Sequence, residues 1–205
     1  MKVLAIAGAL ITTIACSSPT TSSPAPSSPT PIACVTAPTA VIFDGLNSRP
    51  AGSAAPPAYT ESGFTIRLSG GGWSVEPNAY AFRTPTGTQT PGLRLEAALS
   101  FAASTGSRTA IMQITNGGCP FTFASIVLYS SVTDISYEFD GFKNNTSVYS
   151  ASATISNLFG AFQTVVNPRA ADPVDALTLV LTNRPANAVD AGGLPLVIAH
   201  LVFNQ

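Results

Sequence analysis

Few residues in this chain have the chemistry of a catalytic site. His200 is the only histidine, so a serine hydrolase triad would have to use it, and no G-x-S-x-G turn leads into a predicted helix. A catalytic zinc ion needs three or four converging ligands, which one histidine and three cysteines do not supply in the usual set. Strand alternation places His200 on one face with Leu196, Ile198 and Val202, where we expect a structural side chain that is buried or half-buried.

Carboxylates are the other groups that could carry catalysis. Glycosidases use two acids that face each other across a cleft, and Glu138 and Asp140 project from the same side of one predicted strand, about 7 Å apart. That spacing is equally ordinary for a solvated strand face, so we expect a protein that is not an enzyme and holds no cofactor. A structural calcium ion stays an option, with Asp44, Glu61, Asp140 and Asp190 as candidate ligands by residue type alone.

Aromatic side chains are the candidates for ligand binding, because sugar rings stack on exposed flat aromatics. Trp73 follows a glycine run, which we expect to be a hairpin loop, and Tyr59, Tyr80 and Tyr149 adjoin polar stretches. These four side chains are therefore the candidate ligand-binding residues. The alternative for Trp73 is that it fills the core as the largest side chain there.

The N-terminus has the pattern of an exported protein. Lys2 precedes an uncharged run from Val3 to Ala15, which is as long as a signal-peptide core and too short to span a bilayer. The run ends Thr13-Ile14-Ala15-Cys16, which resembles the lipobox of bacterial lipoproteins, where the cysteine is acylated. The pattern usually has an aliphatic residue where Thr13 stands, which leaves ordinary signal cleavage open.

The resemblance implies a cellular location and a lipid anchor. Ser17 follows Cys16, without the Asp that retains such proteins at the inner membrane, so the implied location is the outer membrane or cell surface, with secretion as the alternative. Residues 17–31 are all Ser, Thr, Pro or Ala, a composition that cannot form a core. We expect a signal peptide at 1–15, a disordered tether at 16–33 and one folded domain at 34–205.

The cysteine count predicts one disulfide. With Cys16 assigned to lipid, Cys34 and Cys119 remain as a pair in an exported chain, where disulfides persist. Two buried free thiols are the alternative. Metal binding by two cysteines without nearby histidines is disfavoured.

The folded region reads as strands throughout, because short alternating runs recur between turn clusters and no segment keeps a helical period for three turns. The expected strands are Val41–Leu46, Phe64–Leu68, Trp73–Val75, Ala79–Phe82, Leu93–Leu99, Thr109–Thr115, Phe121–Tyr129, Asp134–Phe139, Ser147–Ile155, Ala161–Val166, Leu177–Thr182 and Leu196–Phe203. This number and spacing predict an all-β fold, a two-sheet antiparallel β-sandwich of jelly-roll type.

The order of these runs resembles exported bacterial jelly-roll domains that are similar in shape to carbohydrate-binding modules. The resemblance rests on Ile42–Leu46, Tyr59–Phe64, Phe121–Leu128 and Tyr137–Phe142. Together with the missing catalytic groups and the lipobox-like N-terminus, this resemblance implies a non-catalytic surface lipoprotein whose domain binds a glycan, such as a polysaccharide. The alternatives are a structural or adhesive envelope protein acting through protein contacts and, more weakly, a glycoside hydrolase-like enzyme.

Charge narrows the range of partners. Charged residues make up 9% of the chain and the formal net charge is −1. The arginines are scattered, so there is no basic stripe to neutralise phosphates, and we expect no nucleic-acid partner. The only expected membrane contact is through the N-terminal lipid.

Overall fold

The computed structural model describes residues 34, 38–70, 72–81, 95–101, 109–130, 134–156, 162–183 and 196–204. The chain divides into two units, Met1–Pro31 and Ile32–Gln205, and every described residue belongs to the second. The signal peptide, Cys16, the tether and Asp190 lie outside the described residues and stay predictions. In the described part, no helix is long and apolar enough to cross a membrane.

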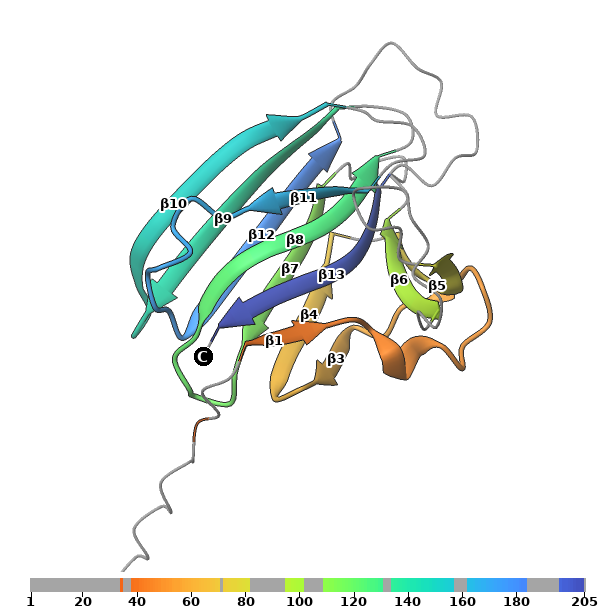
Figure 1. The fold of residues 1–205 in the computed structure, drawn as a ribbon, viewed down its shortest axis with the longest axis horizontal. Coiled ribbons are helices and arrows are strands. Elements are labelled where there is room, and N and C mark those ends of the chain that lie inside the picture. The colour runs from red at the N-terminus through yellow and green to blue at the C-terminus, as the bar shows by residue number, and fades with distance from the viewer. Residues whose placement is uncertain are drawn as a thin grey trace, which may run out of the picture. The chain divides into compact units, whose positions relative to one another are not determined.

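Two antiparallel sheets make up the described domain (Figure 1). The seven-stranded sheet has the order β11-β8-β13-β6-β5-β2, with β1 also paired to β13, and the six-stranded sheet has the order β10-β9-β12-β7-β4-β3. The strands are β1 (Thr39–Val41), β2 (Ser53–Ala54), β3 (Ala58–Glu61), β4 (Phe64–Ser69), β5 (Trp73–Ala81), β6 (Leu95–Phe101), β7 (Thr109–Thr115), β8 (Thr122–Ser130), β9 (Ile135–Lys143), β10 (Thr146–Ile155), β11 (Gln163–Val166), β12 (Ala176–Asn183) and β13 (Leu196–Asn204). The predicted jelly-roll β-sandwich is confirmed.

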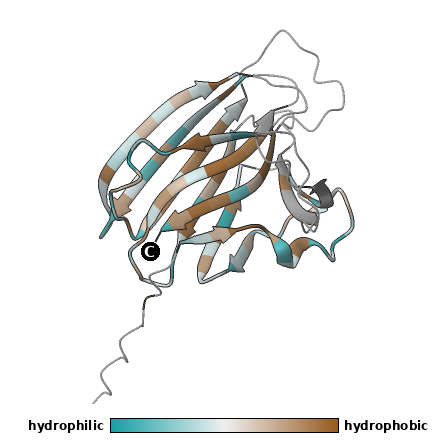
Figure 2. Ribbon diagram, viewed as in Figure 1, coloured by the Kyte–Doolittle hydropathy of each residue, from teal (hydrophilic) through white to brown (hydrophobic). Residues whose placement is uncertain are grey.

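Alternation of apolar and polar residues explains the strands of the six-stranded sheet. On β7, Ala110, Met112 and Ile114 are buried while the residues between them are not, and the buried leucines of β12 lie opposite them. Full burial of such a side chain contributes about 1.5–3 kcal/mol. Figure 2 shows hydrophobic colour over most of β8 and β13, and alternating colour along β10.

Phenylalanine rings join the two sheets in the middle of the core. The Phe64 ring on β4 stacks on Phe203 of β13 with centroids 4.1 Å apart, and Phe121 meets Phe203 edge-on at 5.5 Å. A second contact links Phe123 of β8 to Phe139 of β9 at 5.1 Å. All five rings are at most 1% exposed. Edge-on and offset ring pairs contribute beyond the area they bury.

The disulfide between Cys34 and Cys119 is present, with 5.6 Å between the Cα atoms. Cys119 lies in the turn between β7 and β8, where Gly117 and Gly118 have φ angles of +54° and +90°. Left-handed backbone of this kind favours glycine. The bridge closes a sequence separation of 85 residues, which in the chain-entropy account stabilises the fold by about 4.5 kcal/mol.

The strand expected at Val41–Leu46 ends earlier than predicted. Strand β1 stops at Val41, Phe43 takes a left-handed conformation with φ of 57°, and Asp44–Leu46 form a short 3-10 helix, η1. The Asn47 side chain donates to Asp44 Oδ1 at 3.1 Å and holds this turn. The apolar alternation of this segment therefore predicted buried residues correctly but predicted the wrong secondary structure for them.

Three other expectations change in detail. The runs at Trp73–Val75 and Ala79–Phe82 belong to one strand, β5, with a register shift between Glu76 and Tyr80. The glycine run before Trp73 is not a hairpin, because β4 and β5 belong to different sheets. Short strands β2 and β3 were not among the expected strands. Phe82 and the starts of the expected strands at Leu93 and Ala161 lie outside the described residues.

The last strand, β13, lies between β8 and β6 in its sheet, but the face predicted for His200 is wrong. A register shift between Ile198 and His200 reverses the alternation, so Leu196, Ile198, Leu201 and Phe203 face the core while His200 is half-buried. A bulge inserts one residue and flips every later side chain. His200 therefore does not share a face with Ile198.

Candidate functional site

The six-stranded sheet has one side against the core and one side toward solvent, which we call the outer face. Its residues are the positions that alternate with the buried ones on five of its strands. The outer face comprises Thr65, Arg67, Ile111, Gln113, Thr115, Ser136, Glu138, Asp140, Phe142, Ser150, Ser152, Thr154, Ala176, Thr178, Val180 and Thr182. Most of these side chains carry a hydroxyl, an amide or a charge.

Strand pairing arranges these side chains in rows that cross the sheet. In register from the β10 edge inward, one row reads Ser150, Asp140, Thr178, Gln113 and Arg67. Neighbouring strands lie about 4.8 Å apart, so Asp140 and Arg67 are about 14 Å apart across the row. The row has an acid at one end, a guanidinium at the other and neutral hydrogen-bonding groups between them.

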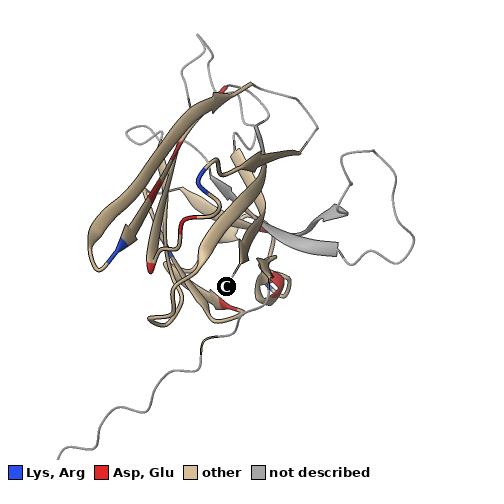
Figure 3. Ribbon diagram, turned by 60° about the vertical axis from the view of Figure 1, so that its left-hand side comes forward, with Lys and Arg blue, Asp and Glu red and all other residues tan. Residues whose placement is uncertain are grey.

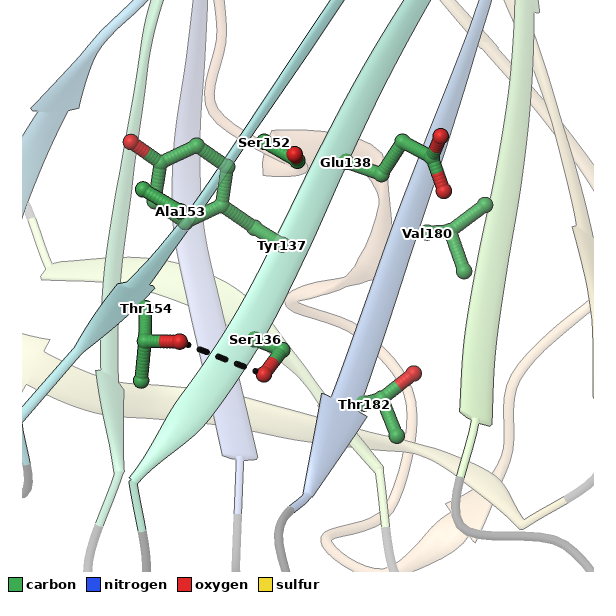
Figure 4. Close-up of a pocket in the computed structure, with 8 residues that line it drawn as sticks. All are labelled: Ser136, Tyr137, Glu138, Ser152, Ala153, Thr154, Val180 and Thr182. Atoms are coloured by element: carbon green, nitrogen blue, oxygen red, sulfur yellow. Dashed lines mark hydrogen bonds between the residues drawn. The ribbon is translucent and has the colours of Figure 1, made fainter.

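Two hollows lie on the outer face. The first has a volume of about 300 Å³ and is lined by Ser136, Tyr137, Glu138, Ser152, Ala153, Thr154, Val180 and Thr182 of β9, β10 and β12 (Figure 4). The second, of about 490 Å³, is lined by Arg67, Gln113, Ile114, Thr115, Phe142, Asn145, Ala176, Leu177 and Thr178. Both hollows therefore open among the hydrogen-bonding side chains of one sheet face.

Hydrogen bonds between neighbouring strands hold several of these side chains in place. Ser136 and Thr154 share a hydroxyl contact of 3.3 Å, drawn as the dashed line in Figure 4. Ser150 Oγ donates to Glu138 Oε1 at 3.3 Å. Charges are sparse, and Figure 3 shows them as isolated red and blue bands on mostly tan ribbons. The first hollow is thus a preorganised polar surface with one carboxylate at its rim.

Trp73 does not have the exposed position that stacking on a sugar would need. Its side chain is 9% exposed and packs in the hydrophobic core, and its Nε1 donates to the backbone oxygen of Ser69 at 2.8 Å. The alternative interpretation of Trp73, as a core residue, is the one that the structure supports. The glycine run ahead of it marks a sheet-to-sheet crossing rather than a ligand loop.

Tyr59 fixes the chain around η1. Its hydroxyl accepts a hydrogen bond from the Gly45 N–H and donates one to Glu61 Oε2, both at 3.0 Å, and its ring lies 5.9 Å from that of Phe43. Burial, and then the negative charge of Glu61, raise the pKa of Tyr59 above its ordinary value. The phenol therefore stays protonated, as the bond to Glu61 requires.

Tyr149 is also internal, with 4% of its surface exposed. Asn167 Nδ2 donates to its hydroxyl at 3.2 Å, and the ring crosses the face of Gly141, its partner on β9. Burial raises the pKa of the phenol. For Tyr80 the structure describes the backbone within β5 but not the side chain. Among the four predicted aromatics, Trp73 and Tyr149 are thus core residues, and no two share a described hollow.

The described acidic candidates also lie in different surroundings. Glu138 and Asp140 lie on the outer face of β9, as predicted, whereas Glu61 accepts hydrogen bonds from Tyr59 and from the Ile42 N–H. Asp44 accepts one from Asn47. No group of three or more His, Cys, Asp or Glu that could hold a metal ion occurs among the described residues. The suggested calcium ligands are therefore not gathered into a site there.

No protein-family model and no curated protein matches the chain, whereas several solved structures do. The family 32 carbohydrate-binding module of C. perfringens NanJ, in complex with galactose, aligns over 72% of this chain and 98% of its own, with 13% identity and a TM-score of 0.44. A variant of the family 29 module CBM29-2 aligns over 83% and 92%, with 10% identity and a TM-score of 0.38. The enzymatically active domain of bacteriophage CBA120 tailspike protein 4 aligns over 70% of this chain but 19% of its own, with 12% identity and a TM-score of 0.40. These are distant structural resemblances, and they assign no ligand.

Sequence reasoning missed Arg67, Gln113 and Thr178 as site residues. Alternation alone places Arg67 opposite Phe64 and Ile66, and so on a solvent-facing side. What it could not supply was that β4, β7, β12 and β9 are neighbours, because these strands are far apart in sequence. The row exists only through that long-range pairing.

Proposed function

We propose that this chain is a non-catalytic surface protein that binds a glycan on the outer face of the six-stranded sheet. The observation that carries the proposal is the row from Asp140 through Thr178 and Gln113 to Arg67, with a hollow beside each end. Carboxylate, amide, hydroxyl and guanidinium groups are the donors and acceptors that match an array of sugar hydroxyls. An extended chain crossing several strands would meet all of them in turn.

The proposed mode of recognition relies on hydrogen bonds more than on ring stacking. Phe142 is the one aromatic side chain among the outer-face residues named above, and it lines the larger hollow. A shallow polar site that competes with water gives weak binding, because each exchanged hydrogen bond contributes only about 0.5–1.5 kcal/mol net. We therefore expect affinities in the micromolar to millimolar range, and no turnover of the glycan.

The test is retention of the exported protein on a panel of polysaccharides in affinity gels. Arg67→Ala should weaken binding by about tenfold or more, and Gln113→Ala by about twofold to tenfold, from the usual contributions of charged and neutral hydrogen bonds. Both side chains are exposed, so the unfolding midpoint should stay nearly constant. Thr164→Ala, at an exposed position on β11 of the other sheet, is the matched control.

Two outcomes would count against this site. Unchanged retention in both variants would remove the outer face as the binding surface. Absence of retention on every polysaccharide would favour the alternative, an envelope protein that adheres through protein contacts.

We further propose that Cys16 is acylated and anchors the protein at the outer membrane or cell surface. The support is the sequence Thr13-Ile14-Ala15-Cys16 and the tether composition that follows it. Metabolic labelling with a clickable palmitate should mark the wild type and leave Cys16→Ala unmarked. A mature N-terminus beyond Cys16 would instead indicate a secreted protein.

A further inference from the structure

The described edges of the two sheets differ greatly in length. The seven-stranded sheet ends in β11, with four residues, and β2, with two. The six-stranded sheet ends in β3, with four residues, on one side and in β10, with ten, on the other. Short edge strands are a common protection against pairing with other chains. Strand β10 lacks that protection, and Figure 1 shows it as the outermost strand of its sheet.

Strand β10 also lacks the chemical protections of an edge. Its sequence, TSVYSASATI, contains no charged residue, no proline and no glycine. The one irregularity, a register shift between Ser147 and Tyr149, lies near its start and leaves the segment from Tyr149 to Ile155 regular. Exposed backbone donors and acceptors on such a segment are a template for another strand.

The side chains of this segment are complementary to the same segment in reverse. An antiparallel copy centred on Ser152 would place Ser152 opposite itself, Ala151 opposite Ala153 and Ser150 opposite Thr154. On the core side the remaining pair would be Tyr149 opposite Ile155. Hydroxyl side chains then meet hydroxyls on one face, apolar side chains meet apolar ones on the other, and no like charges oppose each other.

The exposed fractions of the apolar side chains on β10 also favour pairing with another strand. Ala153 lies four residues after the buried Tyr149 and therefore on the same, core side of the strand, yet its side chain is exposed. Val148 is 38% exposed. Ile155 is only partly buried against the core. A partner strand would cover the free side of these apolar groups, which the described strands leave open.

We propose that a second copy of this chain pairs with β10 through an antiparallel strand centred on Ser152. The two six-stranded sheets would then form one continuous twelve-stranded sheet, and the hollow beside Ser152 and Thr154 would adjoin its symmetry mate. The inference does not rest on glycan binding, because the pairing can be measured without any ligand.

Cysteine pairs test the register directly in the full exported chain. Ser152→Cys should form a disulfide-linked dimer under mild oxidation, because residue 152 faces itself across the axis. Ser150→Cys alone should not, since two copies of residue 150 would be about 13 Å apart along the strands, beyond the reach of a disulfide. Combining Ser150→Cys with Thr154→Cys should restore bridging. Mass spectrometry of the linked peptides distinguishes these bridges from one at another cysteine.

A charge test measures the interface without crosslinking. Ser152→Lys would place two ammonium groups against each other and should raise the dimer dissociation constant at least tenfold in sedimentation velocity, while the matched edge variant Thr164→Lys on β11 should leave it unchanged. Equal bridging by Ser150→Cys and Ser152→Cys would overturn the proposed register. A chain that stays monomeric at all concentrations, with no bridge at residue 152, would overturn the proposal itself.

Discussion

Gly141 is the position where the packing of the core makes the sharpest prediction. It lies on β9 directly opposite Tyr149, and a Cβ added there would stand 2.6 Å from Tyr149 Cζ, closer still to Cε1, and 2.7 Å from Val174 Cγ1. The ring cannot easily move aside, because it is buried and Asn167 donates to its hydroxyl. Overpacking of a well-filled core typically costs 1–3 kcal/mol, and we expect Gly141→Ala to reach about 3 kcal/mol.

A double-mutant cycle separates this clash from any general intolerance of the strand. Tyr149→Leu removes the ring atoms that the new methyl group would meet. In that background Gly141→Ala should cost only about 1 kcal/mol, because the contact with Val174 Cγ1 at 2.7 Å is then the one of the three that remains. The expected coupling between the two substitutions is therefore about 2 kcal/mol.

Urea unfolding followed by tryptophan fluorescence measures the four free energies, since Trp73 is buried in the same domain. An unchanged m-value across the four proteins would show that the midpoints report stability. Additivity of the two substitutions within about 0.5 kcal/mol would refute the reasoning, because residues that do not touch behave in that way.

Three further predictions concern other parts of the core. Trp73→Ala should lower the free energy of unfolding by about 3–5 kcal/mol in urea melts, as expected for a buried ring; a loss below about 1 kcal/mol would contradict its burial. Cys119→Ala should destabilise the domain by about 4.5 kcal/mol from loop entropy, and non-reducing mass spectrometry of the wild type should find Cys34 linked to Cys119 rather than two alkylatable thiols. The folded-state pKa of Tyr59 is raised above 10.0, so its contribution to stability is complete below that pH and is lost as the pH rises beyond it. The free energy of unfolding of Tyr59→Phe should therefore fall less steeply at alkaline pH than that of the wild type. Parallel curves for the two proteins would contradict this.

Local patterns sufficed to locate many of the elements. The alternation in Thr109–Thr115 predicted β7 with its observed bounds. Two consecutive asparagines favour a turn, and Asn144 and Asn145 both have positive φ angles in the two-residue turn between β9 and β10. Such information is contained within a few residues of the chain, so sequence reasoning can reach it.

Features that depend on distant partners were not accessible in this way. The register shift at His200 arises where β13 pairs with β8, which lies some 70 residues earlier in the chain. The sequence of β13 alone does not predict this shift. Trp73 was a candidate ligand-binding residue because glycines precede it, but its side chain is buried in the hydrophobic core. The outer-face row likewise needs four strands to be neighbours, which the order of the sequence does not state.

The disulfide also determines how the domain would respond to mechanical load. Strand β1 is held to β13 by only three residue pairs, Thr39 with Phe203, Ala40 with Val202 and Val41 with Leu201. Without a crosslink, a pull on the chain ahead of Cys34 would reach β1 first and could peel it from the sheet one pair at a time. With the bridge, the same pull enters the domain at Cys119, in the turn between β7 and β8. The short first strand is thereby relieved of tension, and the load is shared by two long strands, one in each sheet.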